Sequence, residues 1–290
     1  MSSANADRLS VHERLAASLA GQYAVRGQVG RGSMATVFVA DDLRTGGPVA
    51  IKVLDPRLVA SLTVERFHRE IAILQRLSHP RIVPLLASGE VAGGIGGPGL
   101  CYYIMPFEGE TLGSRLAEVG PLPLEEVRRL AADLGEAIDY AHLEGIVHRD
   151  VKPDNVLLRD GRGLLCDFGI ARAVVAAGGE RISSSGVVIG TAGYLSPEQA
   201  AGRIDIDGRV DVYGMGCLVY EMLTGEMPFT GPSVHAVILK HLTAVAPPIR
   251  TVRPDVPAYV EVAVMRALSK NRDDRPASTG ALAAALAANN

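Results

Sequence analysis

The sequence contains few cysteines and few lysines. Its three cysteines, Cys101, Cys166 and Cys217, stand far apart, no Cys-x-x-Cys pair occurs, and the N-terminus lacks the pattern of a secretory leader. These features indicate reduced cysteines in an intracellular protein. Lysine occurs at only four positions, and none of them follows a glycine. The absence of a Gly-Lys dipeptide excludes the usual phosphate-binding loop of Walker-type nucleotide hydrolases.

Long apolar runs and basic blocks are also missing. One of the longest apolar stretches, residues 210–223, is interrupted by Asp211, Glu221 and glycines, and falls short of the roughly 20 residues that span a bilayer. We therefore expect no membrane contact by the chain itself. The 29 lysines and arginines are outnumbered by 32 acidic residues, for a formal net charge of −3. No basic cluster is present to neutralise a row of phosphates, so nucleic acid is not an expected partner.

Length and composition are those of an ordinary folded protein. With 48% hydrophobic and 21% charged residues, the 290-residue chain is neither disordered, nor collagen-like, nor a coiled coil. Its length allows one large globule or two packed lobes.

Periodicity divides the chain into a β-rich part and a helical part. A short helix is predicted over residues 9–20, where Ser10 and Glu13 have the spacing of a capping box. β-Rich runs and one helical stretch then fill the region up to residue 107, and helical spacing dominates afterwards. The predicted strands are 23–29, 36–40, 48–54, 82–88 and 100–105, and the predicted helices are 63–77, 123–144, 209–224, 233–244, 257–269 and 276–288.

A glycine-rich turn, Val29-Gly30-Arg31-Gly32-Ser33-Met34-Ala35-Thr36-Val37, lies between the first two of these strands. The alternation after the turn predicts a strand, whereas a dinucleotide-binding fold needs a helix there to direct its N-terminus at the pyrophosphate. The pattern favours a two-stranded flap, whose glycines let backbone N–H groups approach a triphosphate. Taken alone, the segment is equally compatible with an ordinary tight hairpin.

Lys52 is the charged residue of an otherwise apolar strand, Val49-Ala50-Ile51-Lys52-Val53. A charge at the edge of a buried surface needs a partner, and Glu70 on the following helix offers a carboxylate. Such a pair would hold the ammonium ready for phosphate oxygens.

Two short loops gather polar side chains next to apolar runs. The first is His148-Arg149-Asp150-Val151-Lys152-Pro153-Asp154-Asn155, and the second ends an apolar run on Asp167-Phe168-Gly169. An Asp and an Asn from separate loops are oxygen ligands suited to Mg²⁺, which leaves coordination positions for phosphate oxygens and water. Each loop by itself is also compatible with a helix cap or a turn.

Taken together, these motifs resemble those of protein kinases, specifically the bacterial eukaryotic-like (Hanks-type) Ser/Thr kinases. The resemblance implies an α+β, bilobal protein kinase fold with a small β-rich N-lobe and a larger, mainly helical C-lobe. We expect an N-terminal helical extension over residues 1–20, the N-lobe over 21–105, and the hinge and C-lobe over 106–290. The matching motifs occur in the family's order: the Gly-rich loop, Ala50-Ile51-Lys52, Glu70, His148-Arg149-Asp150, Asn155, Asp167-Phe168-Gly169 and Ser196-Pro197-Glu198.

The resemblance implies ATP- and Mg²⁺-dependent transfer of the γ-phosphate to Ser/Thr hydroxyls, with Mn²⁺ as an alternative metal. Asp150 would accept the proton of the substrate hydroxyl, and Lys152 would contact the γ-phosphate. Lys52 would hold the α- and β-phosphates and pair with Glu70. The remaining assignments are the metal ligands Asn155 and Asp167, and the nucleotide-binding residues Val29, Gly30, Gly32, Val37, Ala50, Lys52, Met105, Phe107 and Leu157.

Two structural roles and three departures accompany the match. Asp211 would anchor the catalytic loop, and Glu198 would pair with Arg275. The flap carries Ala35 in place of its third glycine, and Ser196 stands where many relatives have alanine. The hinge after Met105 reads Pro106-Phe107-Glu108-Gly109, one residue short of the commoner spacing, and Pro106 would contribute only its carbonyl to the adenine.

The resemblance also implies a switch in the activation loop. Arg149 is a cation beside Asp150, and a phosphate on Ser183 or Ser185 would supply its anionic partner and order the loop. A flexible linker is the alternative for that serine-rich segment. Thr191 is assigned to the floor of the substrate site near Lys152.

The expected partners are ATP and a protein substrate that presents Ser or Thr, and trans-autophosphorylation would involve a homodimer. We expect a cytoplasmic location. If the chain is part of a longer membrane-anchored receptor kinase, we expect it to be the cytoplasmic part. A pseudokinase, which binds without turnover, is the rival interpretation. The joint presence of Lys52, Asp150, Asn155 and Asp167 argues against it.

Overall fold

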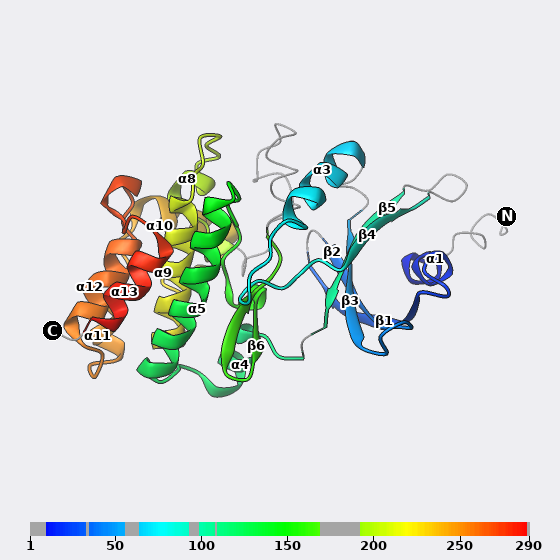
Figure 1. Ribbon diagram of the computed structural model, residues 1–290. Helices are drawn as coiled ribbons and strands as arrows, with labels where there is room; N and C mark the ends of the chain where they lie inside the picture. Colours follow the sequence, from blue (N-terminus) through cyan, green and yellow to red (C-terminus); the bar gives the residue numbers. More distant parts are fainter. Residues whose placement is uncertain are drawn as a thin grey trace. The chain divides into compact units, whose positions relative to one another are not determined.

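The computed structural model describes residues 10–32, 35–55, 64–92, 99–107, 109–168 and 192–288 (Figure 1). These residues divide into two compact units. One contains the described residues up to 76 together with 84–107, and the other contains 77–83 and the described residues from 109 onward. Within the described ranges, no helix is long and apolar enough to cross a membrane.

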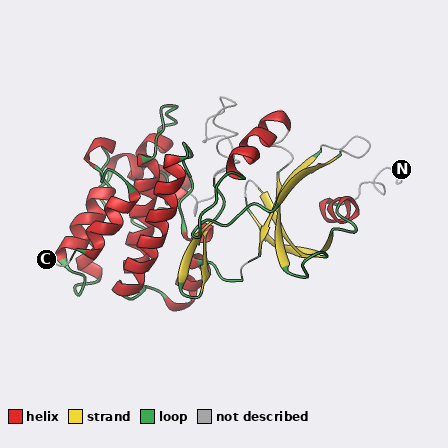
Figure 2. Cartoon of the chain, viewed as in Figure 1, coloured by secondary structure: helices red, strands yellow, loops and turns green. Residues whose placement is uncertain are grey.

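The first unit is built on a five-stranded antiparallel sheet with the strand order β1-β2-β3-β5-β4. Strands are drawn in yellow in Figure 2. The predicted two-stranded flap is confirmed, since β1 pairs with β2, and β4 pairs with β5 in the same antiparallel way. The elements of this unit are α1 (Val11–Ser18), β1 (Tyr23–Arg31), β2 (Ala35–Asp42), β3 (Pro48–Leu54), α3 (Val64–Leu74), β4 (Ala87–Val91) and β5 (Leu100–Pro106).

Helix α1 begins where the sequence predicts. Ser10 Oγ accepts a hydrogen bond from the Glu13 backbone N–H at 3.2 Å, and Glu13 Oε2 accepts one from the Ser10 backbone N–H at 2.7 Å. These two bonds close the capping box and leave Leu15 and Leu19 on the buried side of the helix.

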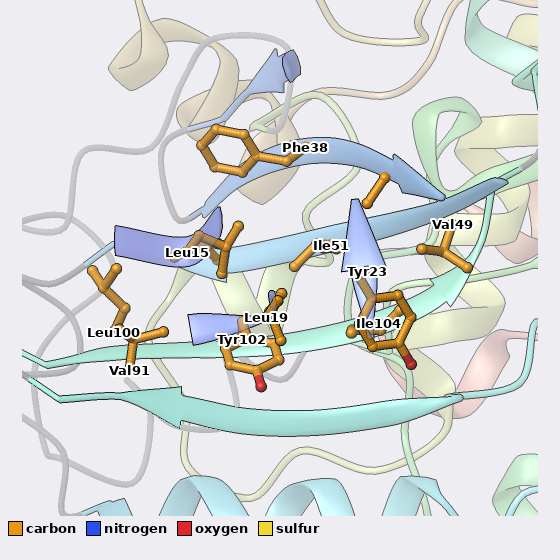
Figure 3. Packing of buried hydrophobic residues seen from close by; sticks show 12 residues of the cluster. Leu15, Leu19, Tyr23, Phe38, Val49, Ile51, Val91, Leu100, Tyr102 and Ile104 are labelled. Atoms are coloured by element: carbon orange, nitrogen blue, oxygen red, sulfur yellow. The ribbon is translucent and has the colours of Figure 1, made fainter. Parts of the chain in front are cut away.

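Those two leucines belong to the hydrophobic core of the first unit, where they pack against one face of the sheet (Figure 3). Successive side chains of a strand point to opposite faces, so the odd-numbered residues of β3 lie on this side, which we name the α1 face. The buried cluster consists of Leu15, Leu19, Tyr23, Phe38, Ala40, Val49, Ile51, Val53, Val91, Leu100, Tyr102 and Ile104.

The second unit is mainly helical. Helix α9 is buried along almost its whole length, and α5 and α12 pack against it, while α13 packs on α5. A two-stranded sheet, β6-β7, lies against α5. The elements are α4 (Leu112–Val119), α5 (Leu124–Leu143), η1 (Pro153–Asn155), β6 (Val156–Arg159), β7 (Arg162–Leu165), α8 (Pro197–Ala200), α9 (Arg209–Thr224), α10 (Val234–Thr243), α11 (Ile249–Val252), α12 (Ala258–Ala267), η3 (Arg272–Asp274) and α13 (Thr279–Ala287).

The prediction of a strand over residues 82–88 is wrong for most of that segment. Strand β4 begins only at Ala87. Before it, Val83 donates its backbone N–H to Leu165 O at 2.9 Å, and Leu165 donates to Arg81 O at 2.8 Å. These bonds attach the chain to the end of β7, and Pro84, which lacks an N–H, interrupts any ladder that would continue from there. Only the start of the apolar run at 82–86 is buried, at Ile82 and Val83, whereas Leu86 is exposed.

Candidate active site

Strand register places several of the expected nucleotide-binding residues on one face of the first unit's sheet. Val37 lies opposite Lys52, and Ala50 lies opposite Met105. Directly opposed residues of antiparallel strands share a face. Val37, Ala50, Lys52, Tyr103 and Met105 therefore share the face opposite α1, which we name the lysine face. Tyr103, which sequence analysis did not assign, lies opposite Lys52.

The glycine-rich segment forms the predicted flap. Gly30 pairs with Val37 and Arg31 with Thr36 across the β1–β2 hairpin, and Gly32 donates its N–H to Ala35 O at 2.8 Å. A strand, not a helix, follows the turn, so the dinucleotide-binding alternative is excluded for this segment. Ser33 and Met34 lie outside the described residues.

Two other residues of the first unit bear on the nucleotide assignments. Glu70 lies in α3, but its side chain is outside the described part of the structure. The backbone N–H of Phe107 donates to Pro48 O at 3.2 Å. This N–H extends the pairing of β3 with β5, so any contribution of Phe107 to a nucleotide would come from its other atoms. Leu157, the remaining expected nucleotide contact, lies in β6 of the second unit and is buried.

The second unit brings together three residues of the loop before β6. Asp150 Oδ2 accepts hydrogen bonds from Lys152 Nζ at 2.9 Å and from Asn155 Nδ2 at 3.0 Å. The Asn155 amide also donates to the Asp150 backbone carbonyl at 2.7 Å. One carboxylate is thus oriented by a cation and an amide from the same short loop.

His148 ties this loop to the one that carries Asp167. Its Nε2 lies 3.0 Å from Cys166 O, its Nδ1 accepts the Asp150 backbone N–H at 3.2 Å, and its ring lies 4.6 Å from the Phe168 ring. Complete burial lowers the pKa of His148, so the neutral ring donates from Nε2 and accepts at Nδ1. The side chain therefore acts as a fixed spacer between the two loops.

Asp211 anchors the start of the loop, as the family resemblance implies. This carboxylate accepts the backbone N–H groups of His148 at 2.8 Å and Arg149 at 2.7 Å. It also lies 2.8 Å from His142 Nε2. Burial acts to lower the pKa of His142, but the hydrogen bond to Asp211 and its negative charge outweigh this effect and raise it. Asp211 is thereby the common acceptor for two elements of the unit.

Asn155 and Asp167 have the chemistry of metal ligands. The Asn155 amide nitrogen is used in the bonds to Asp150, and its oxygen Oδ1 is the atom that a hard cation would take. Its backbone carbonyl accepts the N–H of Cys166 at 2.9 Å, which brings the following residue, Asp167, next to this loop. Asp167 has a positive φ of 59°, a conformation that few residues other than glycine adopt. The two oxygen donors fit Mg²⁺ or Mn²⁺.

Several predicted residues fall outside the described ranges, and one contributor was missed. Ser183, Ser185 and Thr191 lie in the range 169–191, which the structure does not describe. The sequence motifs did not point to Gln199, whose Nε2 donates to the Arg149 carbonyl at 2.8 Å. The signal was present as the capping-box spacing Ser196-x-x-Gln199 ahead of a short helix.

The sequence is similar to those of known proteins. Residues 23–284 match the family model described as the protein kinase domain. The serine/threonine-protein kinase PknB of Mycolicibacterium smegmatis is 40% identical over 260 residues, which cover 89% of this chain and 41% of that protein. The serine/threonine-protein kinase pkn2 of Myxococcus xanthus is 38% identical over 277 residues, covering 93% and 32%. The chain thus spans less than half the length of these relatives.

Solved structures resemble the chain as well. The kinase domain of Mycobacterium tuberculosis PknI (C20A mutant) aligns with a TM-score of 0.70 at 30% identity and covers 92% of this chain and 95% of that one. The structure of Rad53 1–466 in complex with AMP-PNP aligns with a TM-score of 0.72 at 27% identity, covering 90% and 64%.

Proposed function

Because the chain belongs to the protein kinase domain family, as a bacterial Hanks-type Ser/Thr kinase domain, we propose that it transfers the γ-phosphate of ATP to Ser or Thr hydroxyls of a protein substrate. One observation carries the proposal. The Asp150 carboxylate is held by Lys152 and Asn155 at 2.9 and 3.0 Å, and its loop is fixed by Asp211. A carboxylate so oriented can accept the proton of an attacking hydroxyl.

Each residue of the loop then has a distinct task. Asp150 accepts the hydroxyl proton. Lys152, whose ammonium already lies against Asp150, neutralises charge on the transferred phosphoryl group. Asn155 and Asp167 would hold the divalent cation, which supplies charge neutralisation for the phosphates when bound, and Mg²⁺ is the metal we propose.

The nucleotide is assigned to the lysine face of the first unit. Lys52 would bind the α- and β-phosphates with Glu70 as its partner. The flap glycines Gly30 and Gly32 would cover the phosphates. Pro106 would offer its carbonyl to the adenine amino group. The remaining contacts are assigned to Val29, Val37, Ala50, Met105, Phe107 and Leu157.

We further propose that the kinase phosphorylates its own activation loop at Ser183 or Ser185, with Arg149 as the partner of the phosphate and a homodimer as the reacting species. Thr191 is assigned to the substrate site. Mass spectrometry after incubation with ATP and Mg²⁺ tests this, together with the activity of the Ser183→Ala/Ser185→Ala double variant. An unmodified loop in a fully active enzyme, or full activity of the double variant, would contradict it.

The location that suits this activity is the cytoplasm, where ATP and reduced cysteines coexist. Since the chain spans less than half the length of its PknB and pkn2 relatives, we propose it as the catalytic part of a larger kinase.

The decisive experiment is Asp150→Asn. The amide preserves shape but cannot take the proton, so transfer from γ-labelled ATP should fall by roughly a hundredfold or more, while ATP binding in titration calorimetry should persist. Lys52→Met should also abolish transfer, through lost phosphate positioning. Asp160→Asn is the matched control, because Asp160 lies exposed in the β6–β7 turn with φ 51°, a backbone conformation that Asn adopts as readily as Asp. Wild-type transfer by Asp150→Asn would refute the assignment, and a wild type that binds ATP without transfer would favour the pseudokinase.

A further inference from the structure

Arg149 has an unusual backbone conformation directly before Asp150. Its φ is 67°, in the left-handed region that residues other than glycine rarely occupy. A conformation of this kind persists only where neighbouring groups hold it in place. The groups that hold Arg149 therefore also determine where the chain enters Asp150.

Both peptide groups that flank Arg149 are held by side chains. On the N-terminal side, the Arg149 N–H donates to Asp211 at 2.7 Å. On the C-terminal side, the Arg149 carbonyl accepts from Gln199 Nε2 at 2.8 Å, and the N–H of the same peptide group, which belongs to Asp150, donates to His148 Nδ1 at 3.2 Å. The plane of the peptide that leads into Asp150 is thus fixed at both ends.

Gln199 is itself fixed, which is why it can hold another group. Its Oε1 accepts the Ser196 backbone N–H at 3.0 Å, and its own backbone N–H donates to Ser196 Oγ at 3.3 Å. With the oxygen committed to Ser196, the NH₂ group has to face the Arg149 carbonyl. Gln199 and Asp211 are only 4% and 1% exposed, so water does not compete for these bonds.

We propose that Gln199 is a positioning residue for phosphoryl transfer: its side-chain amide holds the Arg149 carbonyl and thereby sets the position of the Asp150 carboxylate. This inference rests on the proposed function and extends it to α8, the helix that follows residues 169–191. Through Gln199, the placement of α8 acts on the residue that accepts the proton.

The informative variant is Gln199→Glu, because it separates the two roles of the side chain. One carboxylate oxygen can still accept the Ser196 N–H and keep the cap. The other faces the Arg149 carbonyl as a second acceptor, so attraction becomes repulsion. We expect the maximal rate of autophosphorylation at saturating ATP to fall between roughly tenfold and a hundredfold at pH 8, with KM for ATP changed by less than about twofold.

Lowering the pH should restore the activity of the Gln199→Glu variant. A protonated glutamic acid donates an O–H to the Arg149 carbonyl and replaces the lost bond. Burial beside a carbonyl favours this neutral form. The rate of Gln199→Glu divided by the wild-type rate at the same pH should therefore rise as the pH falls from 8 to 5.5. A role confined to capping α8 predicts a constant ratio.

Two further variants distinguish the positioning role of Gln199 from its role in the cap. Ser196→Ala removes the hydroxyl that accepts the Gln199 backbone N–H but leaves the side-chain bonds of Gln199 to the Ser196 N–H and to the Arg149 carbonyl, so its rate should fall less than that of Gln199→Met. Gln199→Met preserves length and volume but lacks both polar groups, and should lower the maximal rate without any pH-dependent recovery. It also serves if the Glu variant does not fold.

The outcomes are distinguishable from failure of the proposed function. If Asp150→Asn is inactive but Gln199→Met has the wild-type rate, or if the Gln199→Glu ratio does not change with pH, the positioning role is overturned and the proposed function stands. If Asp150→Asn keeps the wild-type rate, the proposed function fails, whatever the Gln199 variants do.

Discussion

Glu198 and Arg275 form a bidentate ion pair that is almost wholly buried. The two nitrogen–oxygen distances are 2.7 and 2.8 Å, and the side chains are 6% and 0% exposed, respectively. The Arg275 guanidinium also lies 4.9 Å from the centre of the Tyr213 ring. The pair joins α8 to the loop before α13, so the helix that carries Gln199 is attached to the helical core of its unit.

Breaking this pair from one side should destabilise the protein strongly. Arg275→Met leaves the Glu198 carboxylate buried without its cation, so we expect the free energy of unfolding to fall by about 3–5 kcal/mol. Urea denaturation followed by circular dichroism measures the loss. Arg203→Met provides the control, because the Arg203–Asp205 pair is half-exposed and should contribute less than about 1 kcal/mol. Equal losses for the two variants would contradict the claim that burial determines the effect.

The buried His241 should make the fold sensitive to acid. Its burial, with the Lys270 charge as a second cause, lowers the pKa to about 3, while Nδ1 lies 2.9 Å from the Tyr213 hydroxyl. Between pH 6.5 and 3 the unfolded chain takes up a proton at this position that the folded chain does not. The stability from the neutral ring is therefore complete above pH 6.5 and is lost as the pH falls, by up to about 1.4 kcal/mol per unit.

Two histidine variants test this slope. His241→Gln should lose less stability than wild type between pH 6.5 and 4.5, measured by urea denaturation at each pH. His235→Gln should follow the wild-type curve, because His235 is exposed at the start of α10. A His241→Gln curve parallel to that of wild type would show that another group takes up the proton.

Ala35, in place of the third flap glycine, should have little effect on nucleotide binding. Its methyl group is buried in β2, and Ala35 lies opposite Leu54 in the sheet. Gly30 and Gly32 are expected to make the closest approach to the phosphates. Ala35→Gly should therefore change the Kd for ATP by less than about tenfold, or roughly 1.4 kcal/mol. A larger change in calorimetric titrations would show that the methyl shapes the site.

Helix α1 should contribute measurably to stability. Leu15 is 0% exposed in the core of the first unit, so Leu15→Ala should lower the free energy of unfolding by about 2–5 kcal/mol. Leu43→Ala is the matched control, because Leu43 is 55% exposed and its loss should stay within about 0.5 kcal/mol. Thermal and urea unfolding measure both. Indistinguishable values would mean that α1 is not a structural part of the unit.

Features that leave a short local pattern in the sequence could be predicted from it. The capping box of α1, the flap, and the Glu198–Arg275 pair could be predicted because short motifs with known partners encode them. The strand at 82–88 was wrong because an apolar run does not reveal its hydrogen-bonding partner, and this run bonds to Leu165 before it reaches the sheet. The Gln199–Arg149 bond joins residues 50 positions apart, and only the fold brings them together.

The hydrophobic core of the first unit includes residues that precede the segment matched by the family model. The family match starts at residue 23, yet Leu15 and Leu19 complete the hydrophobic core around Phe38, Ile51 and Leu100. A recombinant fragment that starts at residue 23 would lack both leucines and expose a contiguous hydrophobic surface on the sheet, which favours aggregation. A recombinant fragment that starts at Ser10 keeps the cap and both leucines, and would make the better reagent for crystallisation and drug screening.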